Sequence, residues 1–219
     1  MFDLDAATLI ARIGTLLVAF TIHELAHALC ADALGDPTPR RMGRISLNPF
    51  VHLDPVGTLV LIFAGFGWAK PVMVNPNNMR GDPDRNMAIV SLAGPASNII
   101  MAVLVSILFR LHIAEFTLQN NGAIPTIDFM LSSFLWINVI LAVFNLLPIG
   151  PLDGLKVLRG ILPRSMGGLL DIVERNGMML LLVMIFLLPM IGIDLFGIVV
   201  GRMSVYLVWA LIFAGQGIL

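Results

Sequence analysis

Long apolar runs restrict the fold of this chain more than any other feature of its sequence. A bilayer core is about 30 Å thick, so a helix that crosses it needs about 20 largely apolar residues. Of the 219 residues, 58% are hydrophobic and 12% are charged, whereas soluble domains carry about 25% charged residues. This supply of charge is too small to cover a soluble globule, so we expect an all-α polytopic membrane protein.

Five runs have the length of membrane-crossing helices, and one further run is too short. The predicted crossings cover residues 8–34, 86–109, 129–147, 177–193 and 203–218. Gly35 is predicted to cap the first of these helices at its C-terminal end. The run 56–67 has only about twelve residues, so we interpret it as re-entrant or buried against other helices. We therefore expect about five to six transmembrane helices with one re-entrant segment.

The remaining composition excludes several classes of protein. High hydrophobicity and low net charge exclude a disordered chain, and the single cysteine, Cys30, excludes a disulfide scaffold. A formal net charge of −1 gives no reason to expect a nucleic-acid partner. The sequence has no internal repeat and no long soluble insertion, so we expect residues 1–219 to form one membrane-embedded domain.

The basic residues predict an orientation in the lipid bilayer. Ten of them fall on one side of the predicted crossings: Arg40, Arg41, Arg44, Lys70, Arg80, Arg85, Lys156, Arg159, Arg164 and Arg175. Arg110 and Arg202 fall on the other side, and Arg12 lies at the outer end of the first helix. Because cytoplasmic loops carry the excess of lysine and arginine, we expect the N-terminus outside and the C-terminus in the cytoplasm.

Three ionisable residues lie inside the first predicted crossing. His23 and His27 are four residues apart, so both imidazoles project from one face of the helix. Glu24 follows His23 directly, within reach of a water held at a metal between the imidazoles. This His-Glu-x-x-His arrangement predicts two zinc ligands and a general base. A solvated polar face is the alternative, but uncompensated polar groups in lipid cost several kcal/mol.

A catalytic zinc site takes three protein ligands, so one more must come from elsewhere in the chain. The histidines of the first helix lie in its cytoplasmic half, which favours a ligand from a cytoplasmic helix end. Asp153 fits this requirement, because it follows the predicted crossing 129–147 after Pro148 and Pro151. The prolines would break the helix at membrane depth, where irregular backbone is tolerated only if it is buried or lines a watery cavity. The alternative is a helix-capping aspartate after a proline-terminated helix.

The two motifs together resemble the site-2 protease family of intramembrane zinc metalloproteases. The second motif of that family, Asn-x-x-Pro-x-x-x-Leu-Asp-Gly, matches at Asn145, Pro148, Leu152, Asp153 and Gly154. The stretches 46–49, 52–55 and 93–98 also look similar to the family. The resemblance covers about residues 21–154, and it is to the short members without a PDZ domain.

The resemblance implies one zinc ion per chain, bound by His23, His27 and Asp153, with Glu24 as the general base that activates the zinc-bound water. It also implies that Asn145 positions the substrate or stabilises the oxyanion, although Asn145 could equally cap freed carbonyls. The implied substrate is a transmembrane protein, cut in or near its membrane-spanning segment in regulated intramembrane proteolysis. The catalytic core would cover about residues 8–155, followed by additional helices at about 177–219. A prokaryotic inner membrane is the implied location, with the active site toward the cytoplasmic side.

Two cytoplasmic segments predict a small membrane-associated β-hairpin or sheet. Residues 41–47 and 70–74 have the pattern of short strands, with Pro71 suited to a strand start or an edge. An exposed edge could pair with an unwound substrate strand. The alternative is an amphipathic loop on the lipid headgroups.

Two other functions remain open from the sequence. A metal transporter or channel could use His23, His27 and Asp153 as a transit site, although such proteins usually show repeated halves. A homologue that binds partners without cutting them is the second, although Glu24 and the three proposed ligands are all present.

Overall fold

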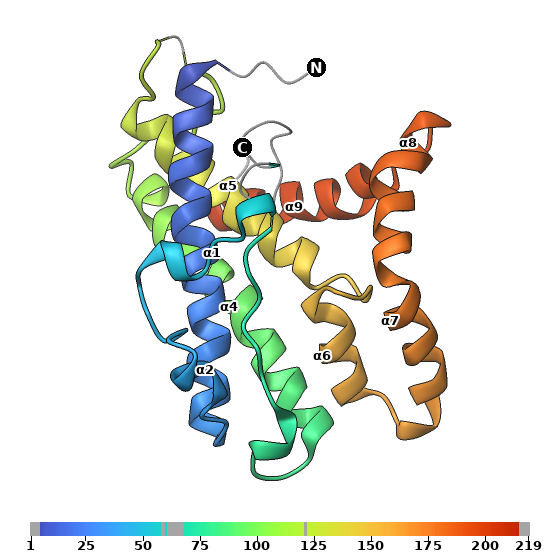
Figure 1. Ribbon diagram of the computed structural model, residues 1–219. Coiled ribbons are helices and arrows are strands. Elements are labelled where there is room, and N and C mark those ends of the chain that lie inside the picture. The colour runs from blue at the N-terminus through green and yellow to red at the C-terminus, as the bar shows by residue number, and fades with distance from the viewer. Residues whose placement is uncertain (1–4, 58–59, 61–67, 121, 215–219) are drawn as a thin grey trace.

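The computed structural model describes residues 5–57, 60, 68–120 and 122–214, and most of them are helical (Figure 1). The α-helices are α1 (Ala6–Leu34), α2 (Thr38–Arg41), α4 (Pro83–Arg110), α5 (Ile127–Asn145), α6 (Asp153–Ile161), α7 (Gly167–Leu182), α8 (Leu188–Met190) and α9 (Arg202–Phe213). Short 3-10 turns are η1 (Pro49–Val51), η2 (Pro76–Asn78) and η3 (Arg164–Met166), and π-helical turns are η4 (Val183–Leu187) and η5 (Gly197–Gly201).

Four helical stretches in the described part of the chain are long and apolar enough to cross a membrane. They are Ala6–Leu34, Pro83–Arg110, Ile127–Asn145 and Arg164–Met190. The predicted helical fold is therefore confirmed, and helices long and apolar enough to cross a membrane lie at the first three predicted crossings. The predicted re-entrant run 56–67 falls mostly on residues outside those described.

The C-terminal part differs from the prediction in two ways. The fourth stretch begins at Arg164 instead of residue 177, because its polar first turns are held by ion pairs. Arg159 contacts Asp171 at 2.7 Å and Glu174 at 2.8 Å. The last apolar helix is Gly197–Phe213, which is shorter than the other four, and α9 runs across the direction of α1 and α7 (Figure 1). Five full crossings are therefore not supported.

The ends of the long helices follow from local sequence. Asp5 accepts a hydrogen bond from the Thr8 amide at 2.7 Å at the start of α1, and Asp82 caps α4 in the same way. Gly35 ends α1 with a φ of 109°, a left-handed conformation that glycine adopts without steric cost. The predicted glycine cap is thus confirmed.

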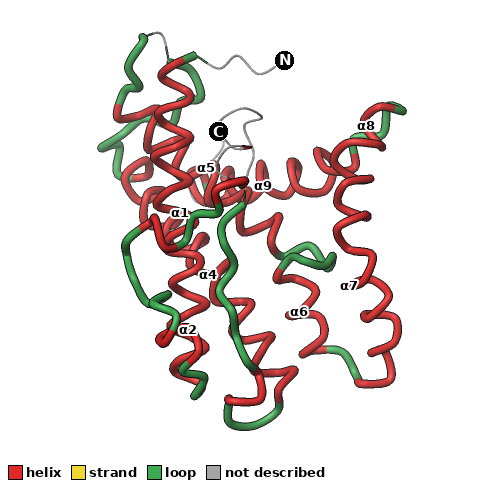
Figure 2. Tube along the Cα trace, viewed as in Figure 1, coloured by secondary structure: helices red, strands yellow, loops and turns green. Residues whose placement is uncertain are grey.

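The predicted β-hairpin is wrong for the described residues, which contain no strand (Figure 2). Arg44 explains why its two segments do not pair. Arg44 belongs to the first segment, and its buried guanidinium donates to the carbonyl oxygens of Val51, Lys70 and Pro71 at 2.6, 3.2 and 3.3 Å. These carbonyls are occupied by a side chain instead of strand amides. In the part of the chain that the structure describes, an isolated antiparallel bridge between Leu53 and Ala69 is the sheet-like contact that remains.

The core lies where α4, α5 and the C-terminal helices meet. Its fully or nearly buried members include Ala102 of α4, Leu135 and Val139 of α5, and Val200 and Val208 near the C-terminus. Helix α4 also packs against α1 on one side and against α6 on another. Because α4 touches α1, α5 and α6, it fixes the positions of all three.

Asp36 attaches the elongated loop 70–75 to the end of α1. Its carboxylate accepts from the Thr38 hydroxyl at 2.6 Å, from the Asn75 amide at 2.7 Å and from the Asn78 side chain at 2.8 Å. Burial favours the neutral acid, but these hydrogen bonds outweigh it and hold the pKa of Asp36 below its ordinary value. The loop is therefore held by a carboxylate that stays ionised.

We expect Asp36→Ala to lower the stability of the fold by about 2 kcal/mol or more, because several hydrogen bonds to a charged group are lost. Since folding lowers the pKa of Asp36, its contribution is complete above the ordinary value of about 3.9 and is lost as the pH falls through the folded value. Thermal unfolding in detergent at several pH values measures both effects. Asp32→Ala is the control, because Asp32 makes a single, partly exposed ion pair with Arg40. Equal losses for the two variants would contradict the prediction.

Candidate metal centre

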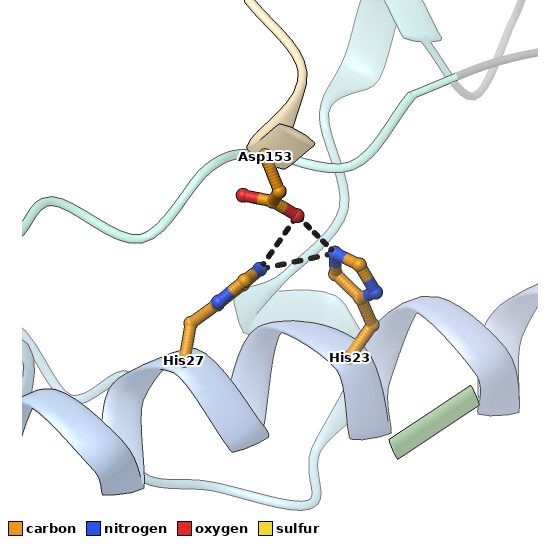
Figure 3. Close-up of side chains that lie close together, drawn as sticks. All are labelled: His23, His27 and Asp153. Carbon is orange, nitrogen blue, oxygen red and sulfur yellow. Dashed lines mark hydrogen bonds and ion pairs between the residues drawn. The ribbon is translucent and has the colours of Figure 1, made fainter. Parts of the chain in front are cut away.

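Two buried imidazoles and one carboxylate meet where α1 and α6 approach each other. His23 and His27 of α1 bring their Nε2 atoms to 3.1 Å from one another. Asp153, the first residue of α6, places its Oδ2 atom 3.3 Å from His23 Nε2 and 3.2 Å from His27 Nε2 (Figure 3). The structure therefore brings the three predicted ligands together.

The hydrogen bond at the far side of the His27 ring fixes its tautomer. Nδ1 of His27 lies 2.7 Å from the carbonyl oxygen of Val90. A carbonyl oxygen only accepts, so this Nδ1 carries the proton and Nε2 of the neutral ring carries a lone pair. Nδ1 of His23 likewise lies 2.6 Å from Oδ1 of Asn98. Both Nε2 atoms then face the centre as acceptors.

Because both Nε2 atoms are acceptors, their close approach to each other and to Asp153 indicates a binding site for a cation. Two lone pairs and a carboxylate oxygen within 4.8 Å of one another repel unless they share a positive charge. Two histidine nitrogens and one carboxylate oxygen are also a donor set that catalytic zinc takes, with a fourth position left for water. The residues present therefore fit a zinc ion.

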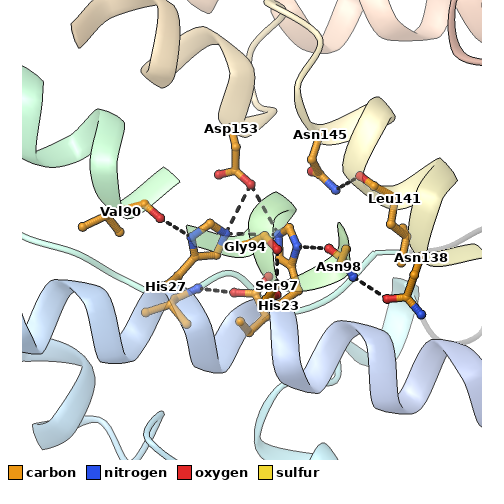
Figure 4. Close-up of polar contacts among 12 residues, drawn as sticks. His23, His27, Val90, Gly94, Ser97, Asn98, Asn138, Leu141, Asn145 and Asp153 are labelled. Carbon is orange, nitrogen blue, oxygen red and sulfur yellow. Dashed lines mark hydrogen bonds and ion pairs between the residues drawn. The ribbon is translucent and has the colours of Figure 1, made fainter. Parts of the chain in front are cut away.

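Gly94 of α4 leaves the space in which the imidazoles meet. A methyl group at this position would collide with Nε2 of His27 and lie 2.6 Å from Cε1 of His23. The stretch 93–98 was noted in the sequence for its family likeness, and the structure shows that its glycine faces the two histidines (Figure 4). Any side chain here would fill the centre.

Close packing around α6 holds Asp153 in place. A side chain at Gly154 would collide with the carbonyl oxygens of Leu146 and Leu147, which follow the end of α5. A side chain at Gly160 would lie 2.8 Å from the carbonyl oxygen of Asp84 in α4. Both ends of α6 thus press directly on backbone, and this contact sets where its first residue lies.

Glu24 lies beside the centre and contacts the loop 70–75. Its Oε2 atom accepts a hydrogen bond from the backbone amide of Val72 at 2.9 Å. The side chain is buried. The loop therefore passes next to the residue that was predicted to be the general base.

Asn145 lies at the end of α5 and is bonded to its own helix. Its side-chain amide donates to the carbonyl oxygen of Leu141 at 2.9 Å (Figure 4). In this position the amide satisfies a backbone carbonyl, as the capping alternative expects. A role in catalysis would require this amide to turn away from Leu141.

The other two histidines lie elsewhere. His52 is fully buried, with Nε2 2.8 Å from the carbonyl oxygen of Ser46. His112 follows the end of α4 with a φ of 53°. Neither belongs to the cluster of potential ligands in the described part of the chain.

Sequence reasoning missed the carbonyl partner of His27 and the amide of Asn138 that lies behind Asn98. The carbonyl of Val90 carries no sequence signal, because any residue supplies one. Asn138 did carry a signal, since it is an amide inside an apolar crossing. Asn98 lies within the family-like stretch 93–98.

Comparisons with known proteins agree with this geometry. The family model described as "Peptidase family M50" matches residues 11–189. YwhC of Bacillus subtilis (strain 168), a protein whose name assigns it as a zinc metalloprotease, is 38% identical over 203 residues, which cover 92% of this chain and 85% of YwhC. Rip2 of Mycolicibacterium smegmatis (strain ATCC 700084 / mc(2)155), assigned in the same way, is 34% identical over 144 residues, which cover 63% of this chain and 52% of Rip2. No solved structure matches the chain significantly.

We expect Gly94→Ala to abolish metal binding, because the added methyl group occupies the space between the imidazoles. The measurement is the amount of Zn²⁺ bound per purified chain, with thermal unfolding of the metal-free protein as a check on folding. Gly14→Ala is the matched control, since nothing lies within 4 Å of a methyl group at that position of α1. Full Zn²⁺ binding by a folded Gly94→Ala protein would contradict the geometry described above.

Proposed function

The chain belongs to peptidase family M50, and from this premise we propose that it is a zinc metalloprotease that cuts membrane proteins in or near their transmembrane segments. The observation that carries the proposal is the convergence of His23, His27 and Asp153 on one point, with two Nε2 lone pairs facing it. The names of YwhC and Rip2 support zinc as the metal.

The surroundings of the centre support a membrane-protein substrate. The histidines lie within a helix that is long and apolar enough to cross a bilayer, and α4, which covers them, is another. A substrate that reaches this depth is itself a membrane-spanning segment. We propose regulated intramembrane proteolysis as the process, with a single-span protein as the simplest substrate.

The proposed chemistry divides between the metal and the chain. A zinc ion held by His23, His27 and Asp153 would lower the pKa of a water molecule and polarise the carbonyl to be cut. Glu24 takes a proton from that water and delivers it to the leaving amine. Asn145 donates to the developing oxyanion after its amide leaves Leu141, which gives it a role only in the reacting complex.

The family relationship favours this proposal over the transport alternative. A metal transporter would also use two histidines and an aspartate, but neither relative is named as one. The loop contact of Glu24 fits a peptidase better, because a transit site needs no carboxylate bonded to the amide of Val72.

The loop 70–75 is the proposed attachment site for the substrate. Val72 and Asn75 donate their backbone amides to Glu24 and Asp36. Met73 and Val74, between them, make no hydrogen bond within the described residues. We propose that an unwound substrate pairs with these open backbone groups and so lies beside Glu24.

We propose that the centre lies toward the cytoplasmic side of a prokaryotic inner membrane. The ten-to-two excess of basic residues supports this placement. His27 lies nearer to the C-terminal end of α1 than to its start, and Arg40 and Arg41 follow that end. Arg85 lies at the start of α4. The N-terminus is then outside, and the C-terminus is cytoplasmic if the short stretch Gly197–Phe213 completes a crossing.

We expect Glu24→Gln to lower cleavage by about 10²–10⁴-fold, because a general base is lost. Glutamine keeps an oxygen that accepts from the Val72 amide, so the loop stays in place. Cleavage of a tagged single-span protein in liposomes and bound Zn²⁺ per chain are the two measurements. Asp153→Ala is the comparison, since it loses both Zn²⁺ and cleavage. Full activity of Glu24→Gln would show that the proposed mechanism is wrong.

We expect Val74→Pro to lower cleavage at least tenfold, because proline lacks the backbone amide that would donate a hydrogen bond to the substrate. Val74→Ala keeps the amide and serves as the matched control with near-normal cleavage. Val72→Pro removes the contact with Glu24 and is expected to lose cleavage as well. Thermal unfolding of each variant shows that the fold is retained. Normal cleavage by Val74→Pro would exclude backbone pairing at this position.

Single cysteines are expected to report opposite sides of the membrane in a chain that first carries Cys30→Ala. Asn77→Cys, in the exposed loop before α4, should react with an impermeant maleimide only from the cytoplasmic side. Leu118→Cys, in the exposed segment between α4 and α5, should react only from the outside. The reverse pattern of labelling would invert the proposed orientation.

A further inference from the structure

We propose that Asn98 and Asn138 are positioning residues that fix the tautomer and the direction of His23 as a metal ligand. This inference rests on the zinc centre of the proposed function. Neither asparagine is a proposed ligand, and Asn138 bonds to Asn98 and Phe134 instead of to a histidine. Their action would pass through hydrogen bonds alone.

A chain of three hydrogen bonds joins His23 to the backbone of α5. Oδ1 of Asn98 lies 2.6 Å from Nδ1 of His23. The side-chain amide of Asn98 donates to Oδ1 of Asn138 at 2.8 Å, and that of Asn138 donates to the carbonyl oxygen of Phe134 at 2.8 Å. Figure 4 shows His23, Asn98 and Asn138 following one another across α1, α4 and α5.

The carbonyl at the end of the chain sets the direction of every bond in it. A carbonyl oxygen cannot donate, so the amide nitrogen of Asn138 must face Phe134 and its oxygen must face Asn98. Asn98 must then turn its nitrogen to Asn138 and its oxygen to His23. Nδ1 of His23 consequently carries a proton, and Nε2 keeps the lone pair that a metal needs.

Burial makes this arrangement obligatory. Asn98 and Asn138 are both 0% exposed, so no solvent competes for their polar atoms. An amide turned the wrong way would place two donors or two acceptors against each other, at a cost of about 1–3 kcal/mol for each unsatisfied group. The two amides therefore hold one orientation, and His23 holds one tautomer.

The two histidines differ in how their outer nitrogen is held. His27 uses the backbone carbonyl of Val90, which remains whatever residue is at that position. His23 depends on side chains, so its orientation can be changed by substitution. Changes at Asn98 or Asn138 should therefore disturb one ligand and leave the other intact.

The experiment measures the affinity of the full chain for Zn²⁺ in detergent, by competition with a chelator. Asn138→Leu has similar volume and removes the anchor, so Asn98 is free to turn its nitrogen toward His23. We expect Zn²⁺ affinity to fall about 10–100-fold, the range typical of lost outer partners of metal ligands. The visible absorption of Co²⁺ bound in place of Zn²⁺ should change as well, because the ligand geometry changes.

Two further variants separate positioning from packing. Asn98→Asp still accepts from Nδ1 of His23, so Zn²⁺ affinity should stay within twofold of the wild-type value or rise, even if stability falls. Asn98→Leu should lose affinity as Asn138→Leu does, and the double variant should lose no more than the worse single variant. Ser106→Ala is the matched control, because Ser106 is a buried polar residue of α4 that bonds only within its own helix.

The outcomes distinguish the inference from the function on which it rests. If Asn138→Leu lowers the thermal stability of the metal-free chain but leaves Zn²⁺ affinity and the Co²⁺ spectrum as in Ser106→Ala, the asparagines serve packing only and the inference is overturned. If Asn138→Leu does not fold, Asn138→Ala replaces it, and the same comparison applies. If Asp153→Ala binds Zn²⁺ as tightly as the wild-type chain does, the proposed function itself is overturned.

Discussion

Repulsion between two imidazole lone pairs and a carboxylate is the constraint on which the rest of this structure depends. Such groups stay together inside a protein only if a cation lies among them or if the surrounding packing forces them into contact. Here the packing is supplied by α4, whose Gly94 leaves room for the imidazoles, and by α6, whose glycines let it press on the end of α5 and on α4. The space in which the two imidazoles and the carboxylate meet is therefore formed by several helices together and by none of them alone.

The three residues proposed as ligands could be singled out from the sequence because the pattern that marks each of them is local. His23 and His27 share a helix face by spacing alone, and Asp153 lies in a motif whose prolines end a crossing. The long apolar helices could also be predicted from the sequence, since an apolar run of about 20 residues is typical of a membrane-crossing helix. What these features have in common is that a short window of sequence contains all the information.

Features that depend on contacts between distant segments could not be predicted in the same way. The predicted hairpin is wrong because Arg44 donates hydrogen bonds to the carbonyl oxygens of Lys70 and Pro71. A pattern of alternating residues does not show which backbone groups an arginine side chain will contact. The start of the fourth crossing stretch was misplaced because Arg159 holds the polar turns of α7. The orientation of His23 depends on an amide forty residues further along the chain from Asn98.

The distance in sequence between the parts of the centre has a consequence for the order of its assembly. His23 and His27 enter the membrane with the first helix, but Asp153 is synthesised only after α4 and α5. A nascent chain that ends before α6 carries two of the three ligands, and an incomplete ligand set binds zinc weakly. The proposed zinc site therefore cannot be complete until Asp153 has been made, and we expect a protease of this design to stay inert while α1, α4 and α5 are inserted.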